Sequence, residues 1–214
     1  MGLKYRHIET VEKHAGLLGV LIAIMVSFGG LAEITPLFIK ANSIKPSPGV
    51  KPYDALRLVG RDIYVREGCY TCHSQMIRTL RFETQRYGEY STLGDSVYDR
   101  PFQWGSKRTG PDLARIGGKY SDAWHRVHLE APRSVVPQSN MPDYPWLSHT
   151  YINGEEVQAR MRVLRTLGDP YTDAQIAGAP DMVLHKTELD AVVAYLQGLG
   201  VHPASGSGIA AKAP

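Results

Sequence analysis

Cysteine is scarce in this chain of 214 residues, with two residues in all. Both fall in the stretch EGCYTCHSQM at residues 67–76. So few thiols exclude a structural zinc site built from two cysteine pairs, because such a site needs four ligands. Cys69, Cys72 and the adjoining His73 therefore form the one compact cluster whose chemistry has to be explained first.

The chain also lacks a strong excess of charge of either sign. Its 24 Lys and Arg side chains nearly balance its 21 Asp and Glu side chains. It shows no basic repeat, recognition-helix pattern or glycine-rich phosphate loop, so a nucleic-acid partner is not expected. Internal repeats are absent as well, and the length leaves room for one ordinary domain plus an additional element.

Charge is missing altogether from one run, AGLLGVLIAIMVSFGGLA at residues 15–32. A helix of that length spans roughly 27 Å, close to the hydrocarbon thickness of a bilayer. A buried core helix would alternate polar and apolar positions, and a signal peptide would have a shorter apolar region with a small-residue cleavage site. We therefore expect an uncleaved transmembrane helix, with Glu33 near one interface. Basic residues flank the run on both sides and do not decide its orientation.

The composition on either side of this run predicts the organisation of the chain. The proline-rich stretch KANSIKPSPGVKPYD indicates a short, stiff linker, and the small residues after position 200 indicate a disordered tail. The expected parts are a cytoplasmic N-terminus at 1–14, a transmembrane anchor at 15–39, a linker at 40–53, a periplasmic folded domain at 54–200 and a disordered tail at 201–214.

The folded part shows signals for several helices and few for strands, so the expected fold class is mainly α. One helix is expected over residues 54–67, and Ser121, Asn153 and Thr187 are candidate N-caps of three more. Long coil is expected from residue 79 to residue 119. The expected buried positions are Leu56, Gly60, Ile63 and Tyr64 in the first helix, Val157, Met161, Leu164 and Leu167 after Asn153, and Leu189, Val192, Val193 and Leu196 after Thr187.

Three kinds of site compete for the Cys-x-x-Cys-His pattern. A disulfide redox pair would sit at a helix N-terminus within a thioredoxin-like βαβ pattern, which is absent. A zinc site lacks its second pair of ligands. Covalent haem attachment uses both thiols on the porphyrin vinyl groups and places the adjacent histidine under the iron. We therefore expect one haem c, bound through Cys69 and Cys72 with His73 as axial ligand, whose flat apolar surface supplements a small core.

The second axial ligand must come from elsewhere in the chain. Met76 lies too close to His73 to cross the ring, and Met161 fits the buried face of a helix. Met182 stays an alternative. Met141 is the expected ligand, because its proline-bounded loop PQSNMPDYPWL can present a thioether without helical constraint. A His–Met pair raises the reduction potential relative to two histidines and suits electron transfer.

Other polar side chains have less specific signals. His125 and His128 are spaced three apart, and a polar helix face or a haem-propionate contact is expected before a metal pair. For the arginines between residues 78 and 115, a solvated surface and a contact with propionates or a partner remain equally open.

The order of these features resembles class I cytochrome c. Gly60 and Tyr64 precede Cys-x-x-Cys-His, and GPDL, MP and an apolar C-terminal helix with Tyr195 follow. The resemblance implies that the first and last helices cross where a small residue meets an aromatic one. It also implies that Pro111 offers its carbonyl oxygen to the second nitrogen of His73, which would fix the tautomer and orientation of that ring.

Nearly the whole chain is similar to the membrane-anchored mono-haem subunit of cbb3-type cytochrome c oxidase, also called subunit II or the O subunit. The similarity lies in GGLAEITPLF, in EGCYTCHSQMIR, in the long block from RPFQWGSKRTGPDL to NMPDYPWL, and in ELDAVVAYLQGLG. The fold that it implies is one transmembrane helix plus a cytochrome c-like domain with long coil insertions. The two cysteines leave none for the dinuclear copper centre of the commoner oxidase subunit II.

This resemblance implies an electron-transfer role in a terminal respiratory oxidase of the bacterial inner membrane. Electrons would enter from a haem c-containing oxidase subunit or a soluble cytochrome c. They would leave toward the b-type haem of the catalytic haem–copper subunit, which reduces oxygen to water and pumps protons. This chain is expected to carry no oxygen-reducing site, and the domain is expected on the periplasmic side because bacteria assemble cytochromes c outside the cytoplasmic membrane.

Three alternatives stay open on the sequence alone. The small anchored cytochrome c subunit of nitric oxide reductase shares the plan, although the block QWGSKRTGPDLARIGGKYS argues against it. A freestanding anchored shuttle would differ only in lacking partners. A membrane-tethered thiol oxidoreductase would be colourless, with reactive Cys69 and Cys72. The 36 residues between His73 and Gly110 exceed the interval in small soluble cytochromes and are a candidate docking surface.

Overall fold

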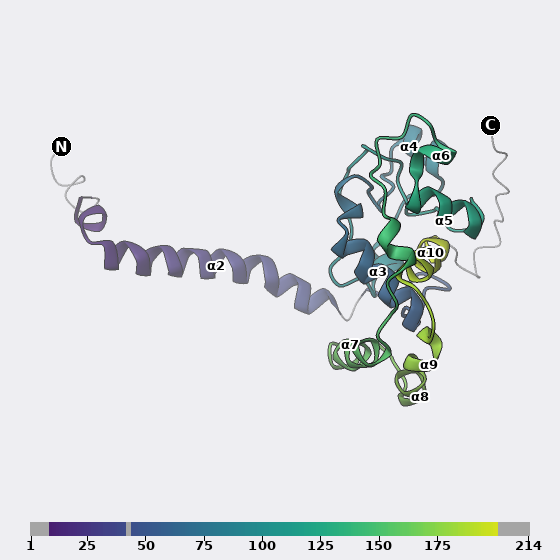
Figure 1. Cartoon of the computed structure of the whole chain (residues 1–214). Coiled ribbons are helices and arrows are strands. Elements are labelled where there is room, and N and C mark those ends of the chain that lie inside the picture. Colours follow the sequence, from purple (N-terminus) through teal and green to yellow (C-terminus); the bar gives the residue numbers. More distant parts are fainter. Residues whose placement is uncertain (1–8, 42–43, 201–214) are drawn as a thin grey trace. The chain divides into compact units, whose positions relative to one another are not determined.

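A computed structural model describes residues 9–41 and 44–200 of the chain as two separate units, with the division between Lys45 and Pro46. The first unit contains the long helix α2, Ala15–Ala41, which continues beyond the expected end of the anchor at residue 39. Among the described residues, the stretch Ala15–Pro36 is the one that has the length and apolar composition to cross a membrane, and none of it is buried by the rest of the chain. The predicted disordered tail at 201–214 lies outside the described residues (Figure 1).

The second unit is built around the crossing of α3, Ala55–Arg66, and α10, Glu188–Gly198. Asp54 caps α3 by accepting a hydrogen bond from the backbone of Arg57, and Thr187 caps α10 in a capping box. Such caps satisfy amide groups that have no partner within the helix, and each contributes about 1 kcal/mol. The two helices are the middle of the unit in Figure 1.

Close approach at this crossing depends on Gly60. A Cβ added there would lie 1.9 Å from the carbonyl oxygen of Ala191 and 2.8 Å from the Cβ of Tyr195. Tyr195 is fully buried, and its ring centroid lies 5.5 Å from that of Tyr64. The expected meeting of a small residue with an aromatic one is therefore confirmed.

Other helices of this second unit lie on opposite sides of the crossing, as Figure 1 shows. On one side are α5, Asp122–Glu130, and α6, Pro132–Val135, with the 3₁₀ helix η3, Pro145–Ser148, packed against α5 and α10. On the other are α7, Gly154–Thr166, α8, Asp173–Ala177, and α9, Ala179–Val183. The predicted caps Ser121 and Asn153 both accept backbone hydrogen bonds at the starts of α5 and α7.

The predicted core positions are mostly confirmed. Leu189, Val192, Val193 and Leu196 are buried in α10, as are Val157 and Met161 in α7. Leu56 and Leu164 are half-buried and pack on the core. The expectation for Leu167 was wrong, because α7 ends at Thr166 and the side chain of Leu167 is 57% exposed.

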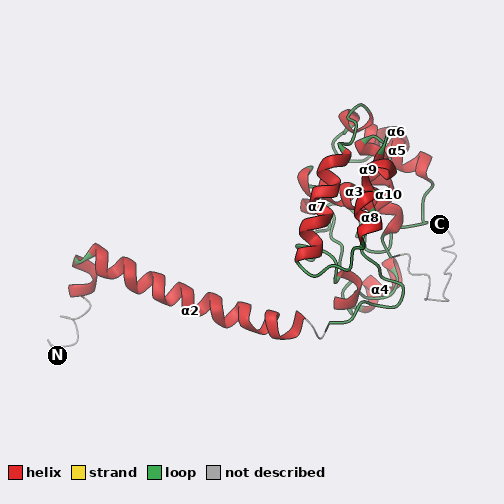
Figure 2. Cartoon of the chain, turned by 90° about the horizontal axis from the view of Figure 1, so that it is seen from below, coloured by secondary structure: helices red, strands yellow, loops and turns green. Residues whose placement is uncertain are grey.

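The expectation of long coil from residue 79 to residue 119 needs correction. This segment contains α4, Arg81–Tyr87, and the 3₁₀ helix η2, Leu93–Ser96. Leu80 precedes α4 and makes no side-chain cap, so the usual sequence signal for a helix start is missing there. Regular structure in the described residues is otherwise helical, as Figure 2 shows, and the pairings His73–Arg108 and Tyr151–Thr187 are isolated bridges. The fold is mainly α, as predicted.

Candidate functional site

Cys69, Cys72 and His73 lie on one turn directly after α3. Gly68 adopts a left-handed conformation with φ of 71°, which suits glycine, and the 3₁₀ helix η1, Cys69–Thr71, follows. The backbone amides of Cys72 and His73 both donate to the carbonyl oxygen of Cys69, over 3.2 and 3.0 Å. This tight turn places three chemically reactive side chains together. Both cysteines are half-buried and form no disulfide.

The surroundings of Cys69 do not favour thiol chemistry. Burial raises the pKa of its thiol from 9.0 to about 12, and the nearby charge of Glu67 acts in the same direction. A reactive cysteine of a thiol oxidoreductase has a lowered pKa, because the thiolate is the nucleophile. The thiol-oxidoreductase alternative therefore loses its chemical support at this position.

The loop that contains Gly110 and Pro111 packs against the Nδ1 side of the His73 imidazole. Its Nδ1 lies 2.8 Å from the carbonyl oxygen of Pro111, which can only accept, so Nδ1 carries the proton. Nε2, on the far side of the ring, is then the unprotonated nitrogen that can bind a metal. A Cβ at Gly110 would lie 2.2 Å from Cε1 of His73, so glycine is what allows the backbone to pack against the ring.

Met141 lies in the loop between α6 and η3. It is half-buried and packs on the same core cluster as Cys69. The loop is tied to α5 by a 2.9 Å hydrogen bond from the amide of Tyr144 to the carbonyl oxygen of Leu129. By contrast, Met161 is 2% exposed inside α7 and belongs to the core, as predicted.

Two imidazoles on α5 also have unsatisfied nitrogens. Nε2 of His125 and Nδ1 of His128 are buried and have no hydrogen-bond partner. Burial lowers the pKa of both rings, and the proximity of His73 contributes to the effect on His128. Buried polar atoms without partners are uncommon in folded proteins. Two thiols, an unprotonated imidazole nitrogen, a thioether and these two unpartnered nitrogens are the kinds of groups that hold the vinyl groups, iron and propionates of a haem.

Hydrogen bonds link this site to the helix crossing, and the sequence did not predict them. The hydroxyl of Tyr64 donates to the carbonyl oxygen of His73 over 3.2 Å. The hydroxyl of Tyr195 donates to the side chain of Gln75 over 3.0 Å, across 120 positions of sequence. Tyr64 and Tyr195 belong to the class I cytochrome c pattern, which indicated that they are important. No local pattern indicates Gln75 as the partner of Tyr195.

A buried ion network next to the site was also missed. Glu83, which is fully buried in α4, accepts hydrogen bonds from the backbone amide and Nε of Arg78, over 2.8 and 2.6 Å. Arg108 approaches the same carboxylate and also pairs with Asp112. Chiefly through the hydrogen bond from Arg78, these partners lower the pKa of Glu83 below its ordinary value of 4.5.

This pairing predicts acid sensitivity. A carboxyl group with a lowered pKa in the folded state stabilises the fold fully above its unfolded pKa, and the contribution is lost as the pH falls through the folded value. We expect the free energy of unfolding to decline as the pH drops below 4.5, and to decline less steeply in Glu83→Gln. Denaturant unfolding of both proteins across that range measures the difference. Asp95 and Asp190, whose pKa values are also lowered, should leave a residual slope in the variant.

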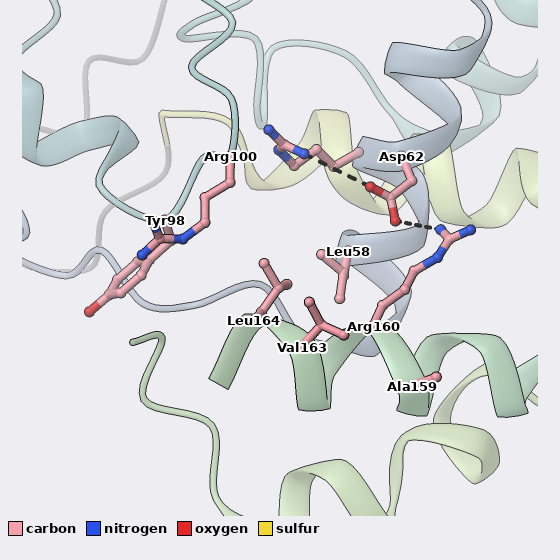
Figure 3. A pocket seen from close by; sticks show the side chains of 9 residues that line it. Leu58, Asp62, Tyr98, Arg100, Ala159, Arg160, Val163 and Leu164 are labelled. Carbon is pink, nitrogen blue, oxygen red and sulfur yellow. Dashed lines mark hydrogen bonds and ion pairs between the residues drawn. The ribbon is translucent and has the colours of Figure 1, made fainter. Parts of the chain in front are cut away.

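A hollow of about 310 Å³ lies away from the cysteines, between α3, α7 and the segment near residue 100. Figure 3 shows Asp62 paired with guanidinium groups on both of its sides, one of them that of Arg160. Arg100 pairs with the buried carboxylate of Asp169. The charged side chains that line the hollow therefore already have partners of opposite charge within the chain. Its lining residues are Leu58, Arg61, Asp62, Tyr98, Arg100, Ala159, Arg160, Val163 and Leu164.

Comparison with known proteins gives one family. The family model described as cytochrome c oxidase, mono-haem subunit/FixO matches residues 8–186, which is more than half of the chain. No curated protein matches the chain.

Proposed function

Because the chain belongs to the FixO family of mono-haem cytochrome c oxidase subunits, we propose that it is the electron-relay subunit of a cbb3-type oxidase. The subunit receives electrons from a cytochrome c donor and passes them toward the b-type haem of the catalytic subunit. The local geometry carries this proposal: Cys69, Cys72 and His73 share a turn, and the carbonyl oxygen of Pro111 accepts a hydrogen bond from Nδ1 of the imidazole.

In this proposal each residue at the site has a separate task. Cys69 and Cys72 would tether a haem through thioether bonds, and His73 would bind its iron through Nε2. Pro111 holds the proton on Nδ1 and orients the ring, which raises the basicity of the ligand. Met141 would bind the iron through its thioether as the second protein ligand. When bound, the haem supplies a one-electron carrier whose potential depends on these ligands and on their hydrogen bonds.

The location follows from the same proposal. The helix Ala15–Pro36, the one candidate span among the described residues, anchors the subunit in the bacterial inner membrane. The domain from residue 54 to residue 200 lies in the periplasm, where haem is attached to cytochromes c. A protease added to sealed inner-membrane vesicles of known orientation would test this, because only a periplasmic domain is cleaved in spheroplasts and protected in inverted vesicles.

The complex itself provides the test of function. Gentle solubilisation and purification through a tag on the C-terminus should recover haem c together with haem b in the reduced-minus-oxidised spectrum. The preparation should consume oxygen in a cyanide-sensitive manner when given an electron donor. Haem c without oxygen uptake or partners would instead favour a freestanding shuttle, and nitric oxide consumption would favour a nitric oxide reductase subunit.

The axial role of Met141 has its own test. Met141→Leu keeps the apolar volume but removes the thioether, so we expect a lower reduction potential and loss of the weak charge-transfer band of methionine-ligated ferric haem. Potentiometric titration and the ferric absorption spectrum of the full-length subunit measure both. Met182→Leu is the matched control, since Met182 is half exposed in α9. An unchanged spectrum in Met141→Leu would remove this residue from the ligand set.

A further inference from the structure

The loop that holds His73 lies beside the segment that follows this histidine. The backbone amide and hydroxyl of Ser74 both donate to the carbonyl oxygen of Lys107, over 3.2 and 2.9 Å. The amide of Gly110 donates to the carbonyl oxygen of Cys72, and that of Leu113 donates to the carbonyl oxygen of Ser74. The position of the Pro111 carbonyl is therefore tied to the backbone on either side of the imidazole.

Asp112, directly after Pro111, reinforces this arrangement with its side chain, which is fully buried. One carboxylate oxygen accepts from the amide of Met76 over 3.1 Å, and the other accepts from the amide of Ala114 over 2.8 Å. Nη1 of Arg108 donates to the first oxygen over 3.1 Å. The Arg108–Asp112 pair thus closes a short loop with Pro111 inside it.

Arg108 connects this loop to α4. Its Nη2 lies 2.9 Å from Oε2 of Glu83. The approach is an ion pair without hydrogen-bond alignment, because Nη2 has no hydrogen-bond partner by geometry. The guanidinium carbon also lies 5.4 Å from the ring centroid of Tyr87. One guanidinium therefore bridges two fully buried carboxylates, one from the long segment after the cysteines and one beside Pro111.

Burying two carboxylates is costly unless their partners are well placed, and in some proteins a buried ion network serves to hold one arrangement more than to add net stability. The arrangement held here is the one that aims the Pro111 carbonyl at Nδ1 of His73. We propose that Arg108, acting with Glu83 and Asp112, is a positioning residue for the His73 imidazole. It thereby keeps the reduction potential of the bound haem lower than the same ligands would give without this positioning. This inference rests on the proposed function, in which His73 binds the haem iron.

The sign of the potential shift separates positioning from simple charge. A firm hydrogen bond from Nδ1 gives the ring anionic character and favours ferric iron, so loosening it raises the potential. Removing a nearby positive charge has the opposite effect and lowers the potential. Arg108→Met removes the charge and the bridge together. Because this variant loses the charge as well as the bridge, we expect the loss of positioning to outweigh the loss of charge and the net shift to be upward, whereas charge alone predicts a downward shift.

Arg108→Lys is the second variant and the milder one. Lysine keeps the positive charge but cannot present two donors in a fixed fork to both carboxylates. Positioning predicts an upward shift here as well, while charge alone predicts none. Arg100→Met is the matched control, because Arg100 also pairs with a buried carboxylate, that of Asp169, but does not touch the Pro111 loop.

The full-length, haem-loaded subunit in detergent is measured by potentiometric titration and by electron paramagnetic resonance of the ferric state, whose g-values report the plane and basicity of the axial imidazole. Upward shifts with altered g-values in both Arg108 variants, and neither change in Arg100→Met, are expected. A downward shift in Arg108→Met with an unchanged Arg108→Lys, or unchanged spectra in both, overturns the proposal. If Arg108→Met does not fold, Arg108→Lys decides alone. Absence of covalent haem from the unaltered subunit would contradict the proposed function instead.

Discussion

Replacing both Cys69 and Cys72 with alanine is expected to yield a colourless protein that no longer assembles with other oxidase subunits. The two half-buried thiols are the covalent attachment points of the proposed haem. Without it, the buried nitrogens of His125 and His128 would stay without a partner, and an irregular domain would lose apolar surface against which to pack. We expect covalently bound haem to fall to background on a denaturing gel stained for haem.

The single substitutions provide the internal controls for this experiment. Cys69→Ala and Cys72→Ala should each keep at most one thioether bond, with a shifted reduced absorption band and lower haem content. Full haem content in the double variant would show that attachment does not use these thiols. If the unaltered protein were colourless and both thiols reacted with an alkylating agent, the thiol-oxidoreductase alternative would return, despite the raised pKa of Cys69.

Gly60→Ala is expected to have the largest effect on stability of any single methyl group added to this domain. The new Cβ would lie 1.9 Å from the backbone oxygen of Ala191, and a backbone atom cannot rotate away as a side chain can. Helices α3 and α10 would have to separate, which also disturbs the packing of Tyr64 on Tyr195. Overpacking of this kind costs about 3 kcal/mol or more.

Thermal or denaturant unfolding of the haem-loaded domain within the full chain measures this cost. Gly178→Ala is a suitable control, because Gly178 has φ of −80° and the nearest atom to its added Cβ is 3.3 Å away. We expect a change of less than about 1 kcal/mol for that variant. Equal effects of the two substitutions would show that the helix crossing does not depend on Gly60.

Prediction from sequence worked best where the signal is local. Ser121, Asn153 and Thr187 were predicted as caps because a short polar side chain before an apolar periodic stretch satisfies the first free amides of a helix. The structure places all three at helix starts. The prediction that Leu167 is buried was wrong for an equally local reason. Periodicity does not show that α7 ends one residue earlier, at Thr166.

The segment from residue 79 to residue 119 was less predictable. α4 is seven residues long and lacks a side-chain cap, so neither periodicity nor capping indicates it. Its burial depends on Glu83, a residue type that is normally exposed, and on partners Arg78 and Arg108 that lie in other segments. For these arginines the sequence left a solvated surface and a contact with propionates or a partner equally open.

What the sequence by itself determined is the set of features contained in single stretches of chain: the apolar helix, the caps, and a turn that carries Cys69, Cys72 and His73. These follow from hydropathy, helix periodicity and the reach of a single turn. The family resemblance also implied that the Pro111 carbonyl meets His73 across 38 positions, and the structure confirms this contact. Only the tertiary structure decided what holds the loop of Pro111 in place, where Arg108 bridges Glu83 and Asp112. Such contacts form only when the whole domain packs. In the buried interior an unpaired charge is costly, so one set of partners is favoured, whereas in water many pairings have similar free energies.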